Sequence, residues 1–152
     1  MDIRVASAGE IGAVQDLWRE YWLSLGLPGD FQHFEEECAA LPGEYGPPRG
    51  RLLLARISGD PAGTAAFRPL NDQACEFKRL YMRPQYRGAG LGKALLHQLL
   101  AEARTLDYKE IYCDTLKSMT SALRMYERMG FVQVEAYADH PTPNAVFFRL
   151  SL

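Results

Sequence analysis

The spacing of apolar residues divides the chain into helices and strands. Apolar positions recur every three or four residues in a segment ending near Leu25, in one ending near Leu106 and over residues 118–129, which predicts amphipathic helices. After a break at residues 26–30, the acidic stretch 31–41 predicts a further helix. Short alternating or continuous apolar runs predict strands at residues 3–6, 52–57, 64–70, 75–82, 109–114, 131–134 and 145–150.

The order of these elements predicts the fold class. Three consecutive strands joined by short turns predict an antiparallel meander, whereas a long helix separates the strands at 75–82 and 109–114. Such a connection makes its two strands parallel neighbours joined by a right-handed crossover. We therefore expect an α/β (layered α+β) chain, in which about four helices flank a mixed, mostly antiparallel seven-stranded sheet. At 152 residues the chain has the size of a single domain, residues 1–152.

Local signals refine the helix ends and the acidic stretch. Ser7 and Glu10 have the spacing of a capping box, Ser118 has the position of an N-cap, and Gly130 marks a C-terminal stop. The acidic run of residues 35–37 predicts a solvated helix face, and attraction of a cationic substrate is the alternative.

Composition narrows the partners and the compartment. A chain with 47% hydrophobic and 24% charged residues and a net charge of -2 is globular and has no basic field for nucleic acid or membrane. Cys38, Cys75 and Cys113 lack C-x-x-C spacing, so we expect free core thiols in a reducing compartment. Neither a leader pattern nor a run of eighteen apolar residues occurs, and we expect a cytoplasmic protein. The three histidines have no metal-ligand spacing, and no metal is expected.

A basic, glycine-rich stretch joins the strand at 75–82 to the following helix. Its residues are Arg87, Gly88, Ala89, Gly90, Leu91, Gly92 and Lys93. The first amides of a helix lack intrahelical partners and lie at the positive end of its dipole, so this junction suits a phosphate. Glycines let the ligand approach the backbone, and Arg87 and Lys93 add positive charge.

Spacing separates the phosphate-binding alternatives. A Walker loop needs glycine at position 87 and Ser or Thr at position 94, where this chain has Arg87 and Ala94. A dinucleotide fingerprint needs glycine at position 93, where the chain has Lys93. A turn that merely packs a helix tightly on a strand remains as an alternative.

Two motifs resemble those of one family. The pattern Arg-x-x-Gly-x-Gly at residues 87–92 resembles the pyrophosphate loop of the GNAT superfamily of acyl-CoA-dependent N-acetyltransferases. About forty residues later, residues 122–131 resemble the family signature A-x-x-x-Y-[EKR]-[KR]-x-G-F, with Tyr126 as its tyrosine. The two matches have the family's order and spacing, and the resemblance covers essentially the whole chain.

The resemblance implies an activity and a cosubstrate site. The activity is transfer of the acetyl group of acetyl-CoA to a primary amine of a small molecule or protein, by direct attack in a ternary complex. The backbone of Leu80, Tyr81 and Met82 would pair with the pantetheine amides as an added strand, and the amides of residues 87–93 would hold the pyrophosphate. Many members have an asparagine seven residues before the tyrosine. This chain has Met119 there, so either the adjacent Ser118 substitutes or the contact is absent.

The implied chemistry needs a base and a proton donor. Most amines are protonated at neutral pH, the oxyanion of the intermediate needs stabilisation, and the departing thiolate takes up a proton. Glu76 occupies the family's position for a general base, although a strand glutamate can instead face solvent or pair with Arg79. Tyr126 matches the tyrosine that donates the proton, and a buried tyrosine satisfied elsewhere is the alternative. Cys113 lies in a strand without an evident histidine partner, so no covalent nucleophile is expected.

The acceptor is the least defined part of this prediction. By the resemblance, the end of the first helix, the loop at 42–48 and the loop containing His140 border the acceptor groove. Tyr21 or Trp22 would then line this groove, and a place in the core is the alternative for both. Charge favours a small cationic amine or a protein amine over a phosphorylated sugar. A different class of function, a non-catalytic acyl-CoA-binding sensor or regulatory module, stays open. Members of the family are often dimers, which implies a homodimer.

Overall fold

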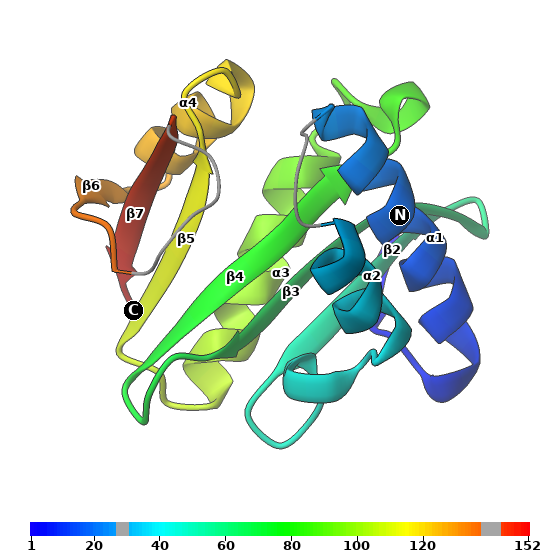
Figure 1. The fold of residues 1–152 in the computed structure, drawn as a ribbon, viewed down its shortest axis with the longest axis horizontal. Helices are drawn as coiled ribbons and strands as arrows, with labels where there is room; N and C mark the ends of the chain where they lie inside the picture. The colour runs from blue at the N-terminus through cyan, green and yellow to red at the C-terminus, as the bar shows by residue number, and fades with distance from the viewer. Residues whose placement is uncertain (27–30, 138–143) are drawn as a thin grey trace.

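The computed structural model describes residues 1–26, 31–137 and 144–152, and places helices on both faces of one sheet (Figure 1). The helices are α1 (Ile11–Leu25), α2 (Phe31–Ala39), α3 (Leu91–Thr105) and α4 (Thr120–Arg128), with 3-10 turns η1 (Ala8–Glu10), η2 (Gly43–Tyr45) and η3 (Pro84–Tyr86). The strands are β1 (Asp2–Val5), β2 (Arg51–Ile57), β3 (Asp60–Pro69), β4 (Ala74–Met82), β5 (Glu110–Leu116), β6 (Val132–Val134) and β7 (Ala145–Ser151). None of the described helices is long and apolar enough to span a membrane.

The sheet has the predicted mixed topology. Its strand order is β1-β2-β3-β4-β5-β7-β6. The only parallel pair in the described sheet is β4 with β5, which α3 connects, and the other five pairs are antiparallel. The predicted fold class and the four helices of the described chain are confirmed.

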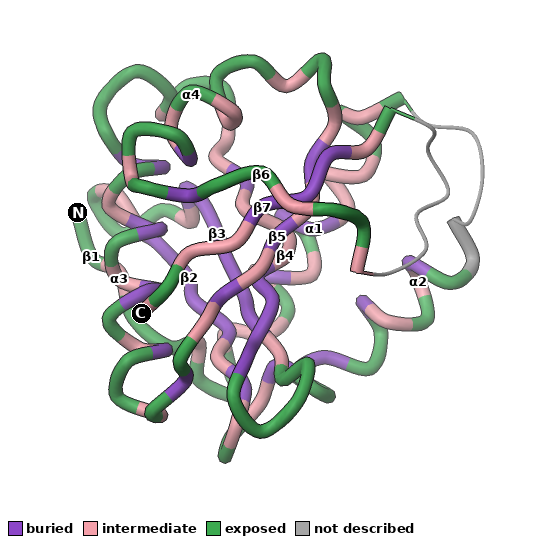
Figure 2. Tube along the Cα trace, turned by 90° about the vertical axis from the view of Figure 1, so that its left-hand side faces the viewer, coloured by how far each residue is buried: buried purple, intermediate pink, exposed green. Residues whose placement is uncertain are grey.

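Two hydrophobic cores lie on opposite faces of the sheet, because strand side chains alternate between faces. Leu52 and Leu54 of β2 pack with Trp18 beneath α1 and α2. Leu53 and Ala55, on the other face of β2, pack with the leucines of α3. The central strands are therefore the most buried part of the trace (Figure 2). The three cysteines are free and buried, as predicted.

The predicted helix ends are confirmed in two places and wrong in one. The Ser7 amide donates to Glu10 Oε1 (3.1 Å), which completes the capping box. Gly130 has a left-handed φ of 94°, and the Phe131 amide donates to the Tyr126 carbonyl (3.0 Å). Ser118, however, does not cap α4.

The reason is that Ser118 lies inside the turn that leaves β5. The Met119 amide donates to the Leu116 carbonyl (2.9 Å) and the Lys117 amide to the Asn144 carbonyl (3.0 Å), which fixes a tight turn before the helix. The Ser118 carbonyl accepts the Thr120 amide (3.0 Å), and α4 begins only at Thr120, with Met119 at its N-cap.

Strand β4 carries a one-residue bulge. Thr64 of β3 pairs with Tyr81, and Ala66, two residues later, pairs with Lys78, three residues earlier, so β4 has one extra residue in this interval. Arg79 supplies it with a left-handed φ of 61°, which is uncommon for a residue other than glycine. The alternation changes phase there, because Phe77 packs in the α3 core whereas Tyr81 packs in the α1–α2 core.

Candidate active site

The two parallel strands part beyond their first residues. β4 pairs with β5 only from Ala74 to Glu76, opposite Glu110 to Tyr112, and the strands then diverge (Figure 1). On the other side, β3 still pairs with Lys78, Tyr81 and Met82. Among the described residues, the edge of β4 that faces β5 therefore has no strand partner after the bulge. The predicted pantetheine-pairing residues Leu80, Tyr81 and Met82 lie along this edge.

The glycine-rich loop presents free amides at the start of α3. The first hydrogen bond of the helix runs from the Ala94 amide to the Gly90 carbonyl (3.0 Å). Across the described chain, the amides of residues 88–93 donate to no backbone or side-chain acceptor. Gly88 and Gly90 have φ values of 83° and 84°, and no described atom lies within 4 Å of a Cβ built at either position. The loop is therefore a conformation that suits glycine, with open space in front of its amides.

Gly92 has a different role from its two neighbours. It is buried in the first turn of α3, and a Cβ there would lie 2.7 Å from Cε of Met82. Its lack of a side chain therefore lets α3 pack on the end of β4. Tight packing, the alternative considered for the whole loop, applies to this glycine alone.

The two charged residues of the loop differ in their surroundings. The Arg87 side chain turns back toward β4, where its Nε donates to the Met82 carbonyl (2.9 Å) and its guanidinium lies 5.6 Å from the centre of the Tyr81 ring. Lys93 is exposed and shares with Arg104 and Arg128 the basic rim of a hollow of about 440 Å³. It forms no ion pair with a described carboxylate. Ala89 and Leu91 contribute main-chain groups to the loop.

Tyr126 is fixed in an aromatic frame beside the opening. Its ring centre lies 5.5 Å from that of Phe77, 5.6 Å from Phe131 and 5.8 Å from Phe148. Burial, and then the nearby Cys113, raise the pKa of Tyr126 well above its ordinary value, so the hydroxyl keeps its proton. This hydroxyl has no hydrogen-bond partner among the described residues, although only 4% of the residue is exposed. It is therefore available as a donor to a bound substrate.

Glu76 is buried and held on both carboxylate oxygens. Arg68 Nε donates to Oε1 (2.8 Å), and the Tyr137 hydroxyl donates to Oε2 (3.1 Å). Lys78 Nζ lies 4.0 Å from Oε2. Only 4% of Glu76 is exposed, so its carboxylate does not face solvent. Its arginine partner is Arg68, whereas Arg79 pairs with Glu37, so both alternatives considered for Glu76 are wrong. Burial, and then the Glu76 charge, raise the pKa of Tyr137, which therefore acts as the donor in this hydrogen bond.

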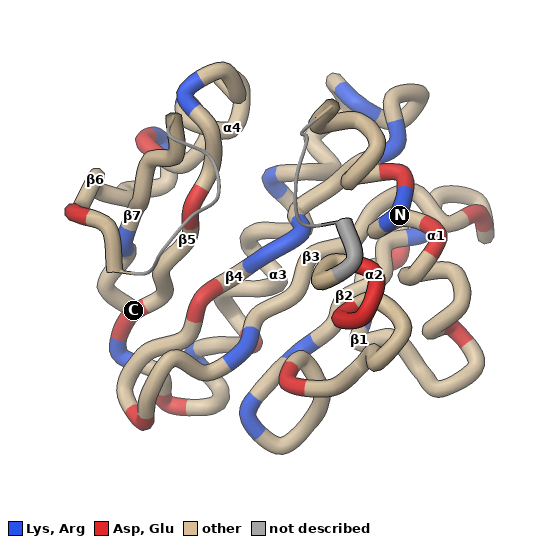
Figure 3. Tube along the Cα trace, viewed as in Figure 1, with Lys and Arg blue, Asp and Glu red and all other residues tan. Residues whose placement is uncertain are grey.

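The acidic run on α2 is a solvated face only in part. Glu35 Oε1 lies 2.6 Å from Nη2 of Arg19 on α1. Figure 3 shows the acidic stretch of α2 as a red segment of the tube. Glu37 pairs with Arg68 and Arg79 of the sheet strands, whereas Glu36 is exposed. Consecutive helix positions point about 100° apart, so three adjacent carboxylates cannot share one face. Because two of the three are neutralised by arginines, this run no longer argues for a cationic acceptor.

Further polar and aromatic side chains border the opening. Lys78 Nζ lies 3.3 Å from Oδ1 of Asp114, which links β4 to β5 where their backbones have separated. The Tyr21 ring lies 5.8 Å from the Tyr81 ring, whereas Trp22 stacks on Phe34. Ser118 is exposed in the turn after β5. His140 and its loop lie outside the described residues.

The sequence missed four residues around Glu76 and the opening, which are Arg68, Lys78, Asp114 and Tyr137. One signal existed, because Arg68 and Glu76 are register partners across the β3–β4 pair and opposite charges favour such positions. Tyr137 comes from the segment after β6, and no local pattern relates it to Glu76.

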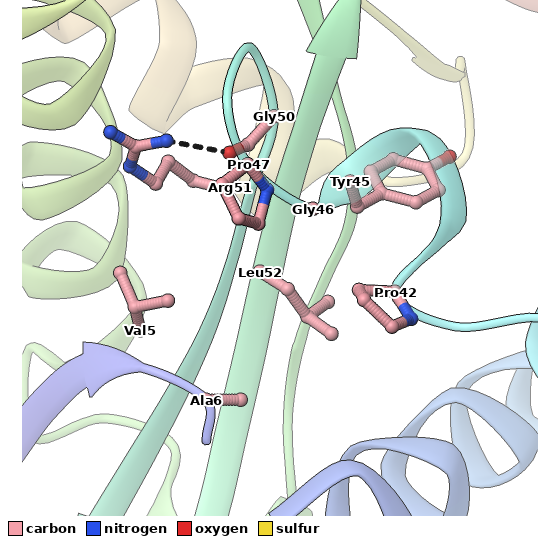
Figure 4. A pocket seen from close by; sticks show the side chains of 9 residues that line it. All are labelled: Val5, Ala6, Pro42, Tyr45, Gly46, Pro47, Gly50, Arg51 and Leu52. Atoms are coloured by element: carbon pink, nitrogen blue, oxygen red, sulfur yellow. Dashed lines mark hydrogen bonds between the residues drawn. The ribbon is translucent and has the colours of Figure 1, made fainter. Parts of the chain in front are cut away.

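The loop at residues 42–48 contributes to a different hollow. This apolar hollow of about 170 Å³ lies between that loop and the ends of β1 and β2 (Figure 4). Leu52 and Pro42 face it, and Arg51 donates from its side chain to the Gly50 carbonyl (2.8 Å) at its rim. None of the nine lining residues was predicted as a catalytic or cosubstrate-binding residue.

A parallel strand pair that parts, a loop of free amides at a helix start and a buried tyrosine beside β4 are the features that the resemblance to acyl-CoA N-acyltransferases implies. Comparison with known proteins is specific. The model of the acetyltransferase (GNAT) family matches residues 11–131. An uncharacterized N-acetyltransferase of Schizosaccharomyces pombe is 37% identical over 138 residues, which are 90% of this chain and 85% of that protein. The chain therefore belongs to the GNAT family and to the acetyl-CoA-dependent N-acetyltransferases.

Solved structures agree with this assignment. A crystal structure of an acyl-CoA N-acyltransferase from Klebsiella pneumoniae is 26% identical with a TM-score of 0.76, covering 99% of this chain and 97% of that one. An acetyltransferase from Salmonella typhimurium, solved with acetyl-CoA, is 20% identical with a TM-score of 0.76, covering 99% of this chain and 93% of that one. The second likeness is one of fold.

Proposed function

We propose that this protein transfers the acetyl group of acetyl-CoA to a primary amine of a small molecule or protein, by direct attack in a ternary complex. The observation that carries the proposal is the unpaired edge of β4, which runs into the free amides of residues 88–93 and lies beside Tyr126. Acetyl-CoA is an extended chain with two amides and a diphosphate. The unpaired edge of β4 offers backbone hydrogen-bond partners for the amides, and the free amides of the loop offer donors for the diphosphate.

The cosubstrate site would be built mainly from the backbone. Leu80, Tyr81 and Met82 would pair with the pantetheine amides, as one strand pairs with another. The amides of residues 88–93 would hold the diphosphate, and the open space at Gly88 and Gly90 permits a close approach. The Arg87 amide, which the prediction from the sequence included, instead donates to the Pro84 carbonyl (3.2 Å). Ser118, which is exposed in the turn after β5, would contact pantetheine in place of the family's asparagine.

Two side chains would move protons. Acetyl-CoA supplies a thioester whose C–S bond breaks as the amine nitrogen forms the new N–C bond. Glu76 would take a proton from the amine through a water, which displaces Tyr137 from Oε2 or shares that oxygen with it. Tyr126 would give its proton to the departing thiolate, and its raised pKa keeps the proton on the hydroxyl until then.

A panel of primary amines with acetyl-CoA, scored by release of free thiol, tests this function. Calorimetry of the same protein measures acetyl-CoA binding in parallel. We expect binding together with turnover of at least one amine, and Glu76→Gln to lose turnover while still binding acetyl-CoA. Binding without turnover of any amine would favour a sensor module instead. Absence of heat on adding acetyl-CoA would contradict the cosubstrate site itself.

A further inference from the structure

Glu37 is the one α2 carboxylate that reaches the sheet. Its Oε2 lies 3.5 Å from Arg68 Nη1, and its Oε1 lies 3.4 Å from Arg79 Nη2 and accepts the Tyr45 hydroxyl (3.0 Å). The side chain is 18% exposed, so these contacts are partly shielded from water. A single carboxylate thus joins the helix α2 to strands β3 and β4.

The first arginine that Glu37 contacts, Arg68, also binds the candidate base Glu76. The guanidinium of Arg68 lies between two carboxylates, with Nε on Glu76 Oε1 and Nη1 toward Glu37. Arg68 Nη1 also donates to Glu44 Oε2 (3.1 Å), but the Glu44 side chain is 71% exposed, so water screens this pair. Glu37 and Glu76 therefore fix the plane of the guanidinium, and that plane in turn orients the Glu76 carboxylate.

The second arginine that Glu37 contacts is Arg79, the residue that forms the β4 bulge. The Arg79 guanidinium lies 5.3 Å from the Trp18 ring and 4.9 Å from the Phe34 ring. Its Nε is buried and has no hydrogen-bond partner among the described residues, so Glu37 is its counter-charge in this part of the molecule. Arg79 is also the left-handed residue at which β4 shifts its register. Holding its side chain therefore holds the backbone that opens β4 toward the cosubstrate.

We propose that Glu37 is a positioning residue for acetyl transfer, which orients the Glu76 carboxylate through Arg68 and holds the β4 bulge through Arg79. This inference rests on the proposed function, because it assigns Glu76 the proton of the amine. It predicts that the placement of α2 and the orientation of the base are linked by one carboxylate.

The chain offers a matched control on the same helix. Glu35 also pairs with an arginine, Arg19, but this pair joins α2 only to α1 and contacts neither Glu76 nor the bulge. Glu37→Gln and Glu35→Gln therefore remove the same charge from the same helix. The substrate is a panel amine that the wild-type protein acetylates. We expect Glu37→Gln to lower kcat for this amine about tenfold, because a misoriented Glu76 removes the proton of the amine more slowly. We expect the KM for acetyl-CoA to stay within about twofold, and Glu35→Gln to keep both constants within about twofold.

A second readout does not depend on turnover. In protein labelled with ¹³C at glutamate carboxyls, the Glu76 resonance is assigned by its loss in Glu76→Gln. We expect this resonance to move in Glu37→Gln and to stay in place in Glu35→Gln. Equal effects of the two substitutions, or none, in kcat and in the Glu76 resonance would overturn the proposal.

Loss of folding in Glu37→Gln and absence of activity in the wild-type protein have separate consequences. If Glu37→Gln shows no cooperative unfolding by circular dichroism, Glu37→Asp replaces it under the same criteria, because it keeps the charge but is too short to reach both arginines. If the wild-type protein acetylates no amine, the proposed function fails, and the ¹³C comparison still decides whether Glu37 orients Glu76.

Discussion

The two sides of the β4–β5 opening are built in opposite ways. The proposed cosubstrate side consists of backbone groups from one continuous stretch, residues 80–93, with glycines at positive φ and amides free to donate. The proposed acceptor side consists of side chains from several elements, in which Arg68 and Tyr137 contact Glu76 and Glu37 contacts Arg68. The first side offers groups that every residue has, and the second offers groups that only particular residues have.

This difference predicts how each side responds to substitution. A backbone site is damaged where a side chain intrudes or where a conformation is lost, and most other changes leave it intact. A side-chain network is damaged by loss of any one member, because its partners are then left buried and unpaired. The following experiments test that contrast, beginning with the residue between the two sides.

Tyr126→Phe should have the largest effect on turnover. We expect kcat to fall about a hundredfold, because the proposed proton donor to the thiolate is lost, while the Kd for acetyl-CoA changes less than about twofold. Thiol release and calorimetry measure the two quantities. Tyr108→Phe is the matched control, because Tyr108 is a buried tyrosine of the same core whose hydroxyl donates to the Arg49 carbonyl (2.7 Å). It should lose stability and keep kcat, and similar kcat losses in both variants would contradict the role of Tyr126.

Gly90→Ala should damage the cosubstrate side alone. The new Cβ enters the space in front of the free amides, and we expect the Kd for acetyl-CoA to rise about tenfold, or about 1.4 kcal/mol. Gly59→Ala is the control, because Gly59 has a φ of 85° and equally open surroundings in the β2–β3 turn. Both variants should lose about 1 kcal/mol of unfolding free energy from left-handed strain. An unchanged Kd in Gly90→Ala would remove the loop from the binding site.

Tyr137→Phe should have a smaller effect, confined to the acceptor side. It removes one hydrogen bond to Glu76 Oε2, and we expect kcat to fall about fivefold with an unchanged Kd for acetyl-CoA. Tyr112→Phe serves as the comparison, since its ring lies 5.0 Å from that of Tyr137 but its hydroxyl does not bond to Glu76. Equal values of kcat for the two variants would indicate that packing, and not the hydrogen bond, matters.

The pKa of the Cys75 thiol tests whether solvent is excluded from the end of the opening where β4 and β5 still pair. Burial raises the pKa of Cys75 to about 12, so above about pH 8.5 the unfolded chain loses this proton while the folded chain keeps it. The free energy of unfolding should therefore fall as pH rises from about 8.5 toward 12, by up to about 1.4 kcal/mol per pH unit. Urea unfolding at several pH values measures the slope, which should be shallower in Cys75→Ala. Equal slopes would mean that the thiol reaches solvent.

The sequence predicted much of the fold because period and order are local signals. Alternation of side chains identified the strands, the long connection made β4 and β5 parallel, and the glycine loop and Tyr126 lie in contiguous motifs. The interpretation of the acidic run as one solvated face was wrong for Glu37, because a helix turns its neighbouring side chains in different directions, toward Arg19 in one case and Arg68 in another.

The surroundings of Glu76 escaped prediction for a related reason. Its partners Arg68 and Tyr137 are 8 and 61 residues away in sequence, and only the sheet brings them together. The assignment of Ser118 as an N-cap failed because long-range turn bonds, including one to Asn144, delay the start of α4. Distant contacts of this kind leave no periodic trace in the chain.

The extra residue at Arg79 makes β4 serve two layers of the molecule in succession. Before it, even-numbered side chains such as Glu76 and Lys78 lie on the helix pair's face, and after it the odd-numbered Tyr81 takes that face while Leu80 and Met82 turn to the other. Deleting this one residue would restore an unbroken pleat and exchange the faces of the side chains from Leu80 onward. The layer in which Tyr81 packs thus depends on a single inserted residue.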